Sequence, residues 1–212
     1  MSDNVNFFND EETDALQELM NIAFGQAAAE LAEVIDISVT LSFPKLNIVK
    51  VSDLMNHIAD DVKYINKCNL VEQRYKGDTG GVAYLIFPHG TEKEFVSMFH
   101  MDEEDNDHEV FIDVEREVLS EVGNILIGAC ISKIFDLLKT NVTYTPPHTM
   151  IGHKFENHFL KGCFTGEDYA IMLNTGFSLS EKTIEGYLFL VNCQSSIEPL
   201  KKALADLFES YE

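Results

Sequence analysis

The sequence predicts an α+β fold: an internally duplicated, pseudo-twofold domain in which long motif helices pack on a mainly antiparallel β-sheet. Three observations lead to this prediction. Two long segments carry apolar residues at helical spacing, strand-like segments follow each of them, and residues of the first half recur in the second half at a constant offset of 103 positions. With 212 residues, the chain can form one sizeable core or two closely packed halves.

The first half begins with a helix over residues 10–34, where apolar side chains recur at helical spacing. A strand-like segment at 37–43 then ends at Pro44. Three more elements are expected before the midpoint of the chain: strands at 62–72 and 82–87, joined by the turn-rich Lys76–Gly81, and a short helix at 92–99. This order predicts a helix followed by antiparallel strands and a closing helix.

The second half repeats this order after an acidic, apolar-poor connector at 102–109. A helix is expected over 114–138, since its apolar residues form one stripe. The remaining expected elements are strands at 142–145, 169–173 and 187–191 and an amphipathic helix at 197–208.

An internal repeat explains the recurring order. The same spacing of residues is found twice, as Glu18-x-x-Asn21-Ile22-x-x-Gly25 and as Glu121-x-x-Asn124-Ile125-x-x-Gly128. Pro44 recurs as Pro147, and Tyr84 recurs as Tyr187. We therefore expect one domain over residues 1–212, made of two repeats at about 10–101 and 110–212.

The repeated residues lie on a polar face of the first helix. At about 100° per residue, Asp14, Glu18, Asn21, Gly25 and Ala28 fall within about 80° of one another. A glycine inside a helix costs about 0.5–1 kcal/mol relative to alanine, so its recurrence needs a reason. Small residues beside a carboxylate and an amide would form a shallow surface against which another protein can lie.

The second helix presents Glu117, Glu121, Asn124 and Gly128 in the same way, although Ile131 replaces the small residue at the end of the face. A glutamate and an asparagine on a polar helix face are commonly only solvated. Their repetition at one offset, together with the glycine and the proline, favours a functional role.

The pattern Asp/Ser-x3-Glu-x2-Asn-x22-Pro resembles the motif of the CheC/CheX/FliY phosphatases. The first copy fits all four positions, with Asp14, Glu18, Asn21 and Pro44. The second copy fits three, with Glu121, Asn124 and Pro147, while Glu117 stands where Asp or Ser is expected. The double motif resembles CheC-type members, since a CheX protein is expected to carry one motif and a FliY-like protein adds a flagellar-switch domain.

The resemblance implies a phosphatase that hydrolyses the phosphoaspartate of a CheY-like response regulator. It implies that Asn21 and Asn124 orient the attacking water and that Glu18 and Glu121 pair with a lysine of the regulator. No cofactor bound by this chain is expected, because Mg²⁺ belongs to the regulator. A CheD-like receptor deamidase is a further partner. The alternatives are a docking module without turnover and a purely structural scaffold.

The charge composition limits the kinds of molecule that this chain is expected to bind. The chain has 15 basic and 36 acidic side chains, and its net charge of −21 argues against nucleic acid and anionic membranes. A basic patch on another protein is the natural counterpart. The N-terminus lacks the features of a signal peptide, and the sequence reads as having no apolar stretch that approaches the ~20 residues of a membrane span. A cytoplasmic location without membrane insertion is therefore expected.

Three other sequence features are not expected to form a metal-binding, calcium-binding or phosphate-binding site. His148, His153 and His158 are spaced by five, which suits neither one helix face nor one strand face, so no metal site is expected. The acidic connector lacks the glycine and closing glutamate of an EF-hand, and Lys76–Gly81 lacks the phosphate-binding spacing of a P-loop.

The two motif copies also differ beside their asparagines. We expect both sites to work and the second to be at least as active. Gly123 would leave room for a partner beside Asn124, whereas Met20 would crowd Asn21 unless it turns into the core.

Overall fold

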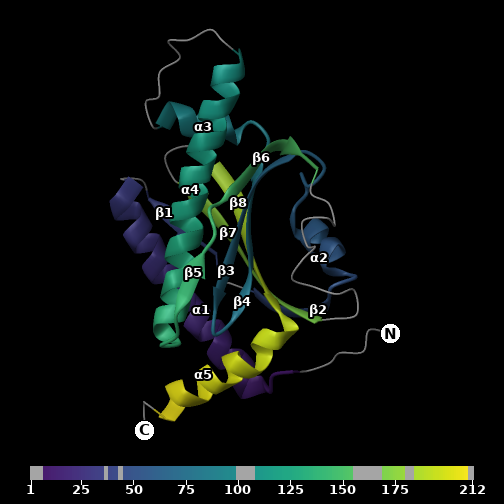
Figure 1. The fold of residues 1–212 in the computed structure, drawn as a ribbon, viewed down its shortest axis with the longest axis vertical. Coiled ribbons are helices and arrows are strands. Elements are labelled where there is room, and N and C mark those ends of the chain that lie inside the picture. The colour runs from purple at the N-terminus through teal and green to yellow at the C-terminus, as the bar shows by residue number, and fades with distance from the viewer. Residues whose placement is uncertain are drawn as a thin grey trace.

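Five α-helices surround one eight-stranded sheet in the computed structural model, which describes residues 7–35, 38–42, 45–98, 108–154, 169–179 and 184–209 (Figure 1). The helices are α1 (Asp10–Ile35), α2 (Leu54–Asp61), α3 (Thr91–Met98), α4 (His108–Leu137) and α5 (Ile197–Glu209), the last preceded by a 3-10 turn, η2 (Gln194–Ser196). The strands are β1 (Val39–Leu41), β2 (Lys45–Lys50), β3 (Cys68–Gly77), β4 (Gly80–Pro88), β5 (Val142–Tyr144), β6 (His148–His153), β7 (Tyr169–Leu179) and β8 (Ile184–Cys193).

Every strand pair of the sheet is antiparallel, and the order is β1-β7-β8-β4-β3-β5, with β2 also on β7 and β6 also on β3. The central pair is β4 with β8, in which Tyr84 faces Phe189 and Ile86 faces Tyr187. The predicted α+β class, with helices on a mainly antiparallel sheet, is confirmed.

Short strands from each half of the chain complete a long strand of the other half. The early strands β1 and β2 pair with β7, whereas the later strands β5 and β6 pair with β3. Because these pairings cross the midpoint of the sequence in both directions, the two halves share one sheet. The division into two repeats at about 10–101 and 110–212 stays a prediction.

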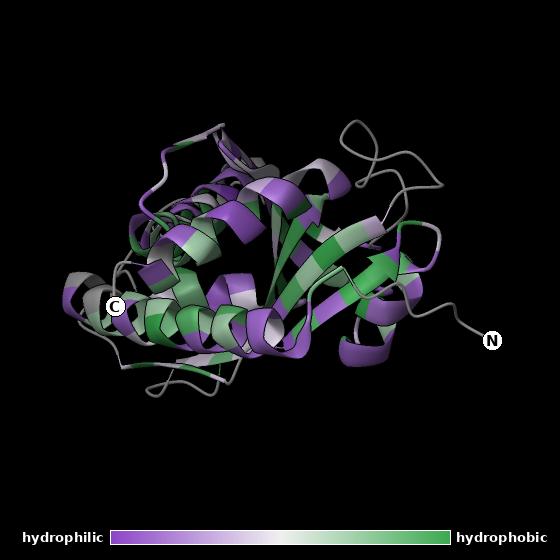
Figure 2. Cartoon of the chain, turned by 90° about the horizontal axis from the view of Figure 1, so that it is seen from below, coloured by the Kyte–Doolittle hydropathy of each residue, from purple (hydrophilic) through white to green (hydrophobic). Residues whose placement is uncertain are grey.

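Apolar side chains fill both faces of the sheet. On one face, residues of α1, α4 and α5 pack against alternate strand residues such as Leu85; on the other, α2 covers a second cluster that includes Tyr84 and Ile86. Strand β4 is therefore buried on both sides, which explains why Gly81–Phe87 is an unbroken buried run. Figure 2 shows mostly hydrophobic strands and helices of mixed character.

Helices α1 and α4 pack against each other on the same side of the sheet and run in opposite directions (Figure 1). The start of α1 is set by a reciprocal capping box. The backbone N–H of Glu12 donates to Asn9 Oδ1, and the backbone N–H of Asn9 donates to Glu12 Oε2, both at 2.8 Å. Three acidic residues in the first turn of α1 add favourable interactions with the helix dipole.

Three elements were not predicted from the sequence. Helix α2 has only two buried apolar residues, Leu54 and Ile58, which is too few to show a period. Strands β2 and β6 have no clear alternation of buried and exposed residues because they pair at the margins of the sheet.

Strand β3 begins at Cys68, so the predicted strand at 62–72 was placed too early. Much of the predicted connector at 102–109, together with Pro44, lies outside the described residues.

Helix α4 corrects one sequence expectation. Its segment Asp113–Leu137 is long and apolar enough to cross a membrane by length and composition, although the sequence had been read as lacking such a stretch. Of its most apolar 18-residue window, 56% is buried inside the protein. Leu119, Leu126 and Ile127 belong to the core cluster that α4 shares with the sheet and α1. These contacts explain the hydropathy of α4 by core packing.

Candidate functional site

The four predicted site residues lie on the two helices that pack together. Glu18 and Asn21 are on α1, Glu121 and Asn124 are on α4, and all four side chains are exposed. The structure therefore agrees with the expected solvent-facing position of the motif, while the roles of these residues stay a prediction.

The supporting motif residues surround these positions. Asp14, Gly25 and Glu117 are exposed, and Gly128 and Pro147 are half-buried. Pro44 lies outside the described residues. Pro147 directly precedes β6, whose residue Thr149 donates from Oγ1 to Ser120 Oγ on α4 at 3.2 Å. The segment that carries Pro147 is thus tied to the motif helix of the second site.

Met20 does not crowd Asn21. Its side chain is 1% exposed and lies in the core with Leu16 and Ala23. The expectation that a bulky residue would weaken the first site holds only if Met20 points outward, and the structure places it inward. The predicted disadvantage of the first site therefore loses this support.

The three glycines of the motif helices fall into two kinds. A Cβ atom added at Gly25 or Gly128 would meet nothing within 4 Å, so open space lies over both. A Cβ atom at Gly123 would lie 2.6 Å from Cγ1 of Val71 on β3. Gly123 is therefore needed for close packing of α4 on the sheet, and the expectation that it leaves room for a partner is wrong. The open space belongs to Gly25 and Gly128 instead.

The Asn124 side chain accepts a hydrogen bond from a buried strand residue that was not predicted from the sequence. Gln73 on β3 is 2% exposed, and its Nε2 donates to Asn124 Oδ1 and to the backbone oxygen of Thr145, both at 3.0 Å. A signal for Gln73 existed in the sequence, since it is the polar member of an apolar stripe between Val71 and Tyr75. Its contact with Asn124 could not be predicted, because 51 residues separate them.

The first site differs in its surroundings. Among the residues that the structure describes, the Asn21 side chain has no hydrogen-bond partner. Its neighbour Ile22 is 44% exposed, one of two large hydrophobic side chains with such exposure in the described part of the chain. An exposed isoleucine beside a polar motif is consistent with a surface that another protein covers.

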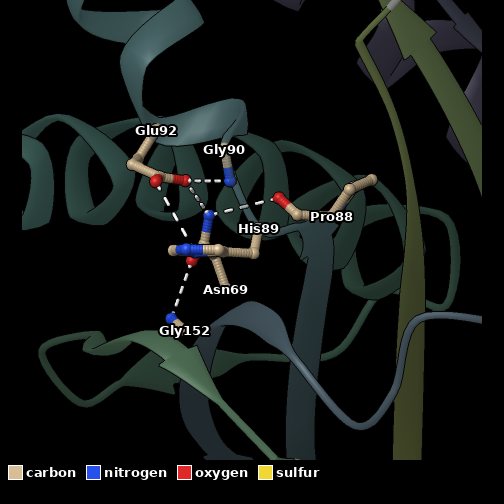
Figure 3. A network of polar contacts seen from close by, with 6 residues as sticks. All are labelled: Asn69, Pro88, His89, Gly90, Glu92 and Gly152. Atoms are coloured by element: carbon tan, nitrogen blue, oxygen red, sulfur yellow. Dashed lines mark hydrogen bonds and ion pairs between the residues drawn. The ribbon is translucent and has the colours of Figure 1, made fainter.

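A buried polar network lies near the second site, where β3, β4, α3 and β6 meet (Figure 3). Asn69 donates from Nδ2 to Glu92 Oε2 at 2.5 Å and to the backbone oxygen of Pro88 at 3.2 Å, and it accepts from the backbone N–H of Gly152 at 3.0 Å. Glu92 also accepts from the backbone N–H of Gly90 at 2.7 Å. The bond from Gly152 joins the end of β6 to β3, and the other bonds of Asn69 join β3 to the end of β4 and to the start of α3.

The histidines of this region do not assemble into a metal centre. His89, His148 and His153 line an open pocket between α3, α4 and β6. Within the described ranges, no group of three or more His, Cys, Asp or Glu side chains is placed to hold a metal ion. His158, the third histidine considered in the sequence, lies outside those ranges.

Two titratable groups of this region are perturbed, and neither provides a nucleophile. Burial raises the pKa of the Cys130 thiol from 9.0 to about 12, so this cysteine of α4 stays protonated near neutral pH. Burial also raises the pKa of Tyr144, whose hydroxyl pairs with Ser132 Oγ at 2.9 Å. The exposed polar groups of the two motifs are the carboxylates of Asp14, Glu18, Glu117 and Glu121 and the amides of Asn21 and Asn124.

The chain matches known chemotaxis proteins. The family model "Chemotaxis phosphatase CheX" matches residues 71–163, which include the second motif helix, and the "CheC-like family" model matches residues 11–48, which include the first. The "CheY-P phosphatase CheC" of Bacillus subtilis is 24% identical over 211 residues, which cover 94% of this chain and 96% of that protein.

Solved structures share the fold. FliY of Thermotoga maritima has a TM-score of 0.67 at 14% identity, covering 94% of this chain and 98% of its own. The CheX chain in the complex of CheX with CheY, BeF3 and Mg²⁺ from Borrelia burgdorferi has a TM-score of 0.51 at 19% identity, covering 81% of this chain and 96% of its own. The fold is that of the CheX and FliY structures, and the two motif helices lie in the segments that the CheX and CheC-like models match. These matches confirm the similarity to CheC-type phosphatases that was recognised from the motifs.

Proposed function

We propose that this protein is a phosphatase that hydrolyses the phosphoaspartate of a CheY-like response regulator. The observation that carries the proposal is the pair of glutamate-plus-asparagine motifs, exposed on two helices that pack side by side. The similarity to a CheY-P phosphatase and to a CheX that binds CheY supports the choice of substrate.

In this proposal, the motif residues need only bind the regulator and position a water molecule. Phosphoryl transfer depends mainly on positioning and on stabilising charge, and the regulator supplies its own Mg²⁺ and lysine for the charge. An asparagine amide can donate and accept hydrogen bonds without titrating, so Asn21 or Asn124 can orient a water molecule in line with the leaving oxygen. Each asparagine reaches the solvent side of its helix, where a docked regulator would lie.

The glutamates have a different task in this proposal. Glu18 and Glu121 lie one helical turn before their asparagines on the same exposed faces. A carboxylate there can form a charge-assisted bond with a lysine of the regulator and fix the docking register. The open space over Gly25 and Gly128 lets the partner approach the helix backbone on the other side of the asparagine.

The second candidate is a docking module that binds a regulator, or a CheD-like deamidase, without turnover. The exposed Ile22 and the open glycines favour a docking surface of either kind. Retention of both the glutamate and the asparagine in both copies favours turnover. We propose that the protein acts in the cytoplasm, where its regulators are phosphorylated.

The test is to mix the protein with phosphorylated response regulators from its own genome and follow loss of the phosphoryl group. Acceleration of hydrolysis for one regulator supports the phosphatase. Stable binding of the phosphorylated form with an unchanged rate of hydrolysis would support the docking module instead.

A further inference from the structure

Gln73 occupies a place where an apolar side chain would be expected. On β3, Val71 and Tyr75 face the helices and belong to the core cluster, and Gln73 lies between them on the same face. Its side chain is 2% exposed, and Oε1 has no hydrogen-bond partner among the described residues. A buried acceptor without a partner costs stability, so its presence needs a reason.

The bonds of Gln73 fix the orientation of two amides. The backbone oxygen of Thr145 can only accept, so the group of Gln73 that faces it at 3.0 Å must be the Nε2 donor. The same Nε2 faces Asn124, which must therefore turn Oδ1 inward. As a result, Asn124 Nδ2 points away from Gln73, and Oδ1 keeps one lone pair for another donor.

By strand pairing, the position on β7 that corresponds to Gln73 on β3 is Thr175. Gln73 follows Glu72, which pairs with the first residue of β6, and Thr175 follows Asn174, which pairs with the first residue of β2. Thr175 is also buried, and its hydroxyl donates to the backbone oxygen of Ser42 at 2.6 Å. Within the described part of the chain, no bond joins it to Asn21.

From this difference we propose that Gln73 is a positioning residue that holds the Asn124 amide in one orientation, so that the second site is preorganised and the first is not. The inference rests on the proposed phosphatase function. An amide that is already oriented loses less freedom when the regulator docks, and this raises turnover without adding a contact to the partner. Thr175 bonds the backbone oxygen of Ser42 as Gln73 bonds that of Thr145, but among the described residues it forms no bond to Asn21.

The experiment isolates the second site. Asn21→Ala serves as the parent, and Gln73→Met, which keeps the side-chain length but removes the donor, is added to it. We expect kcat for hydrolysis of the phosphorylated regulator to fall roughly tenfold while KM stays unchanged, because the amide is still present but free to turn. Gln73→Thr, which introduces the residue found at the corresponding position of β7, should give the same fall, and it is a second variant in case the methionine variant misfolds.

Two controls separate positioning from a structural role. Tyr75→Phe breaks the buried bond from Tyr75 to Asn192 Oδ1 at 2.8 Å, two residues along the same strand, and should lower stability without lowering kcat. In an Asn124→Ala background, Gln73→Met should have no further effect on kcat. An unchanged kcat in both Gln73 variants, or an equal fall when Asn124 is already absent, overturns the proposal.

A measurement on the Asn124 amide itself, made without any regulator, tests the positioning role independently of the proposed phosphatase function. In ¹H–¹⁵N spectra, the Asn124 side-chain amide signals, assigned by their loss in Asn124→Ala, should shift and broaden in Gln73→Met. If the parent protein fails to hydrolyse any regulator, the proposed function fails, and this spectrum still decides the positioning. Asn124 signals that are unchanged in Gln73→Met contradict it.

Discussion

The two glycines of α4 should respond in opposite ways to the same substitution. Gly123 and Gly128 lie in one helix, and each gains about 0.8–1 kcal/mol of helix propensity on replacement by alanine. At Gly128, the new Cβ meets nothing within 4 Å, so Gly128→Ala should stabilise the protein by about that amount. At Gly123, the new Cβ would lie 2.6 Å, 2.9 Å and 3.0 Å from three carbons of Val71, so something must shift.

Overpacking of this kind costs about 1–3 kcal/mol. Since the propensity gain is common to both variants, Gly123→Ala should be less stable than Gly128→Ala by about the overpacking cost. For a domain of this size, that corresponds to a difference of several degrees in Tm, at about 2–4 °C per kcal/mol. Urea unfolding at neutral pH gives the same comparison as a free energy.

Val71 provides the internal control. Adding Val71→Ala removes the two methyl groups that crowd the new Cβ, so it should cost less in the Gly123→Ala background than in the wild type. A Gly123→Ala protein as stable as Gly128→Ala would refute the packing of α4 on β3 described above.

Three further outcomes follow from the site and the core. Glu18→Ala or Glu121→Ala should mainly raise KM for the phosphorylated regulator with little change in kcat; a fall in kcat alone would contradict a docking role. Gly25→Leu and Gly128→Leu should keep the fold, because both positions are open, but weaken regulator binding, measured by titration calorimetry; unchanged affinity would exclude this surface. Burial raises the Cys130 pKa from 9.0 to about 12, so the unfolded chain loses this proton first and stability should fall as pH rises between these values, by roughly 1.4 kcal/mol per unit at most. Urea unfolding at neutral and alkaline pH should show a shallower fall for Cys130→Ala, and an identical slope would contradict the assignment.

The long elements could be predicted from the sequence because each shows its own period. Helices α1 and α4 carry many apolar residues at helical spacing, and the polar motif residues fall between them. Helix α2 and strands β2 and β6 could not be predicted in this way, since they are short and gain their stability by packing on or pairing with the sheet.

The exposed motif residues could be predicted because they follow the helical period. The buried residues that contact the motif helices could not be predicted in this way. Whether Met20 points inward, and what fills the space beside Gly123, depends on neighbours far along the chain. Gln73 shows this most clearly, because its partners Asn124 and the Thr145 carbonyl lie 51 and 72 residues away. A single sequence gives the pattern of a helix face but not the strand that lies beneath it.

The central claim is that the two motif asparagines carry the phosphatase chemistry. The most direct measurement is the rate of phosphate release from a phosphorylated regulator in the presence of wild-type protein and of the Asn21→Ala, Asn124→Ala double variant. Because both side chains are exposed, the double variant should keep its circular dichroism spectrum and unfolding midpoint. With a loss on the order of 10²-fold at each site, hydrolysis should fall nearly to the regulator's own rate. Full acceleration by the folded double variant would show that these asparagines are not the catalytic groups.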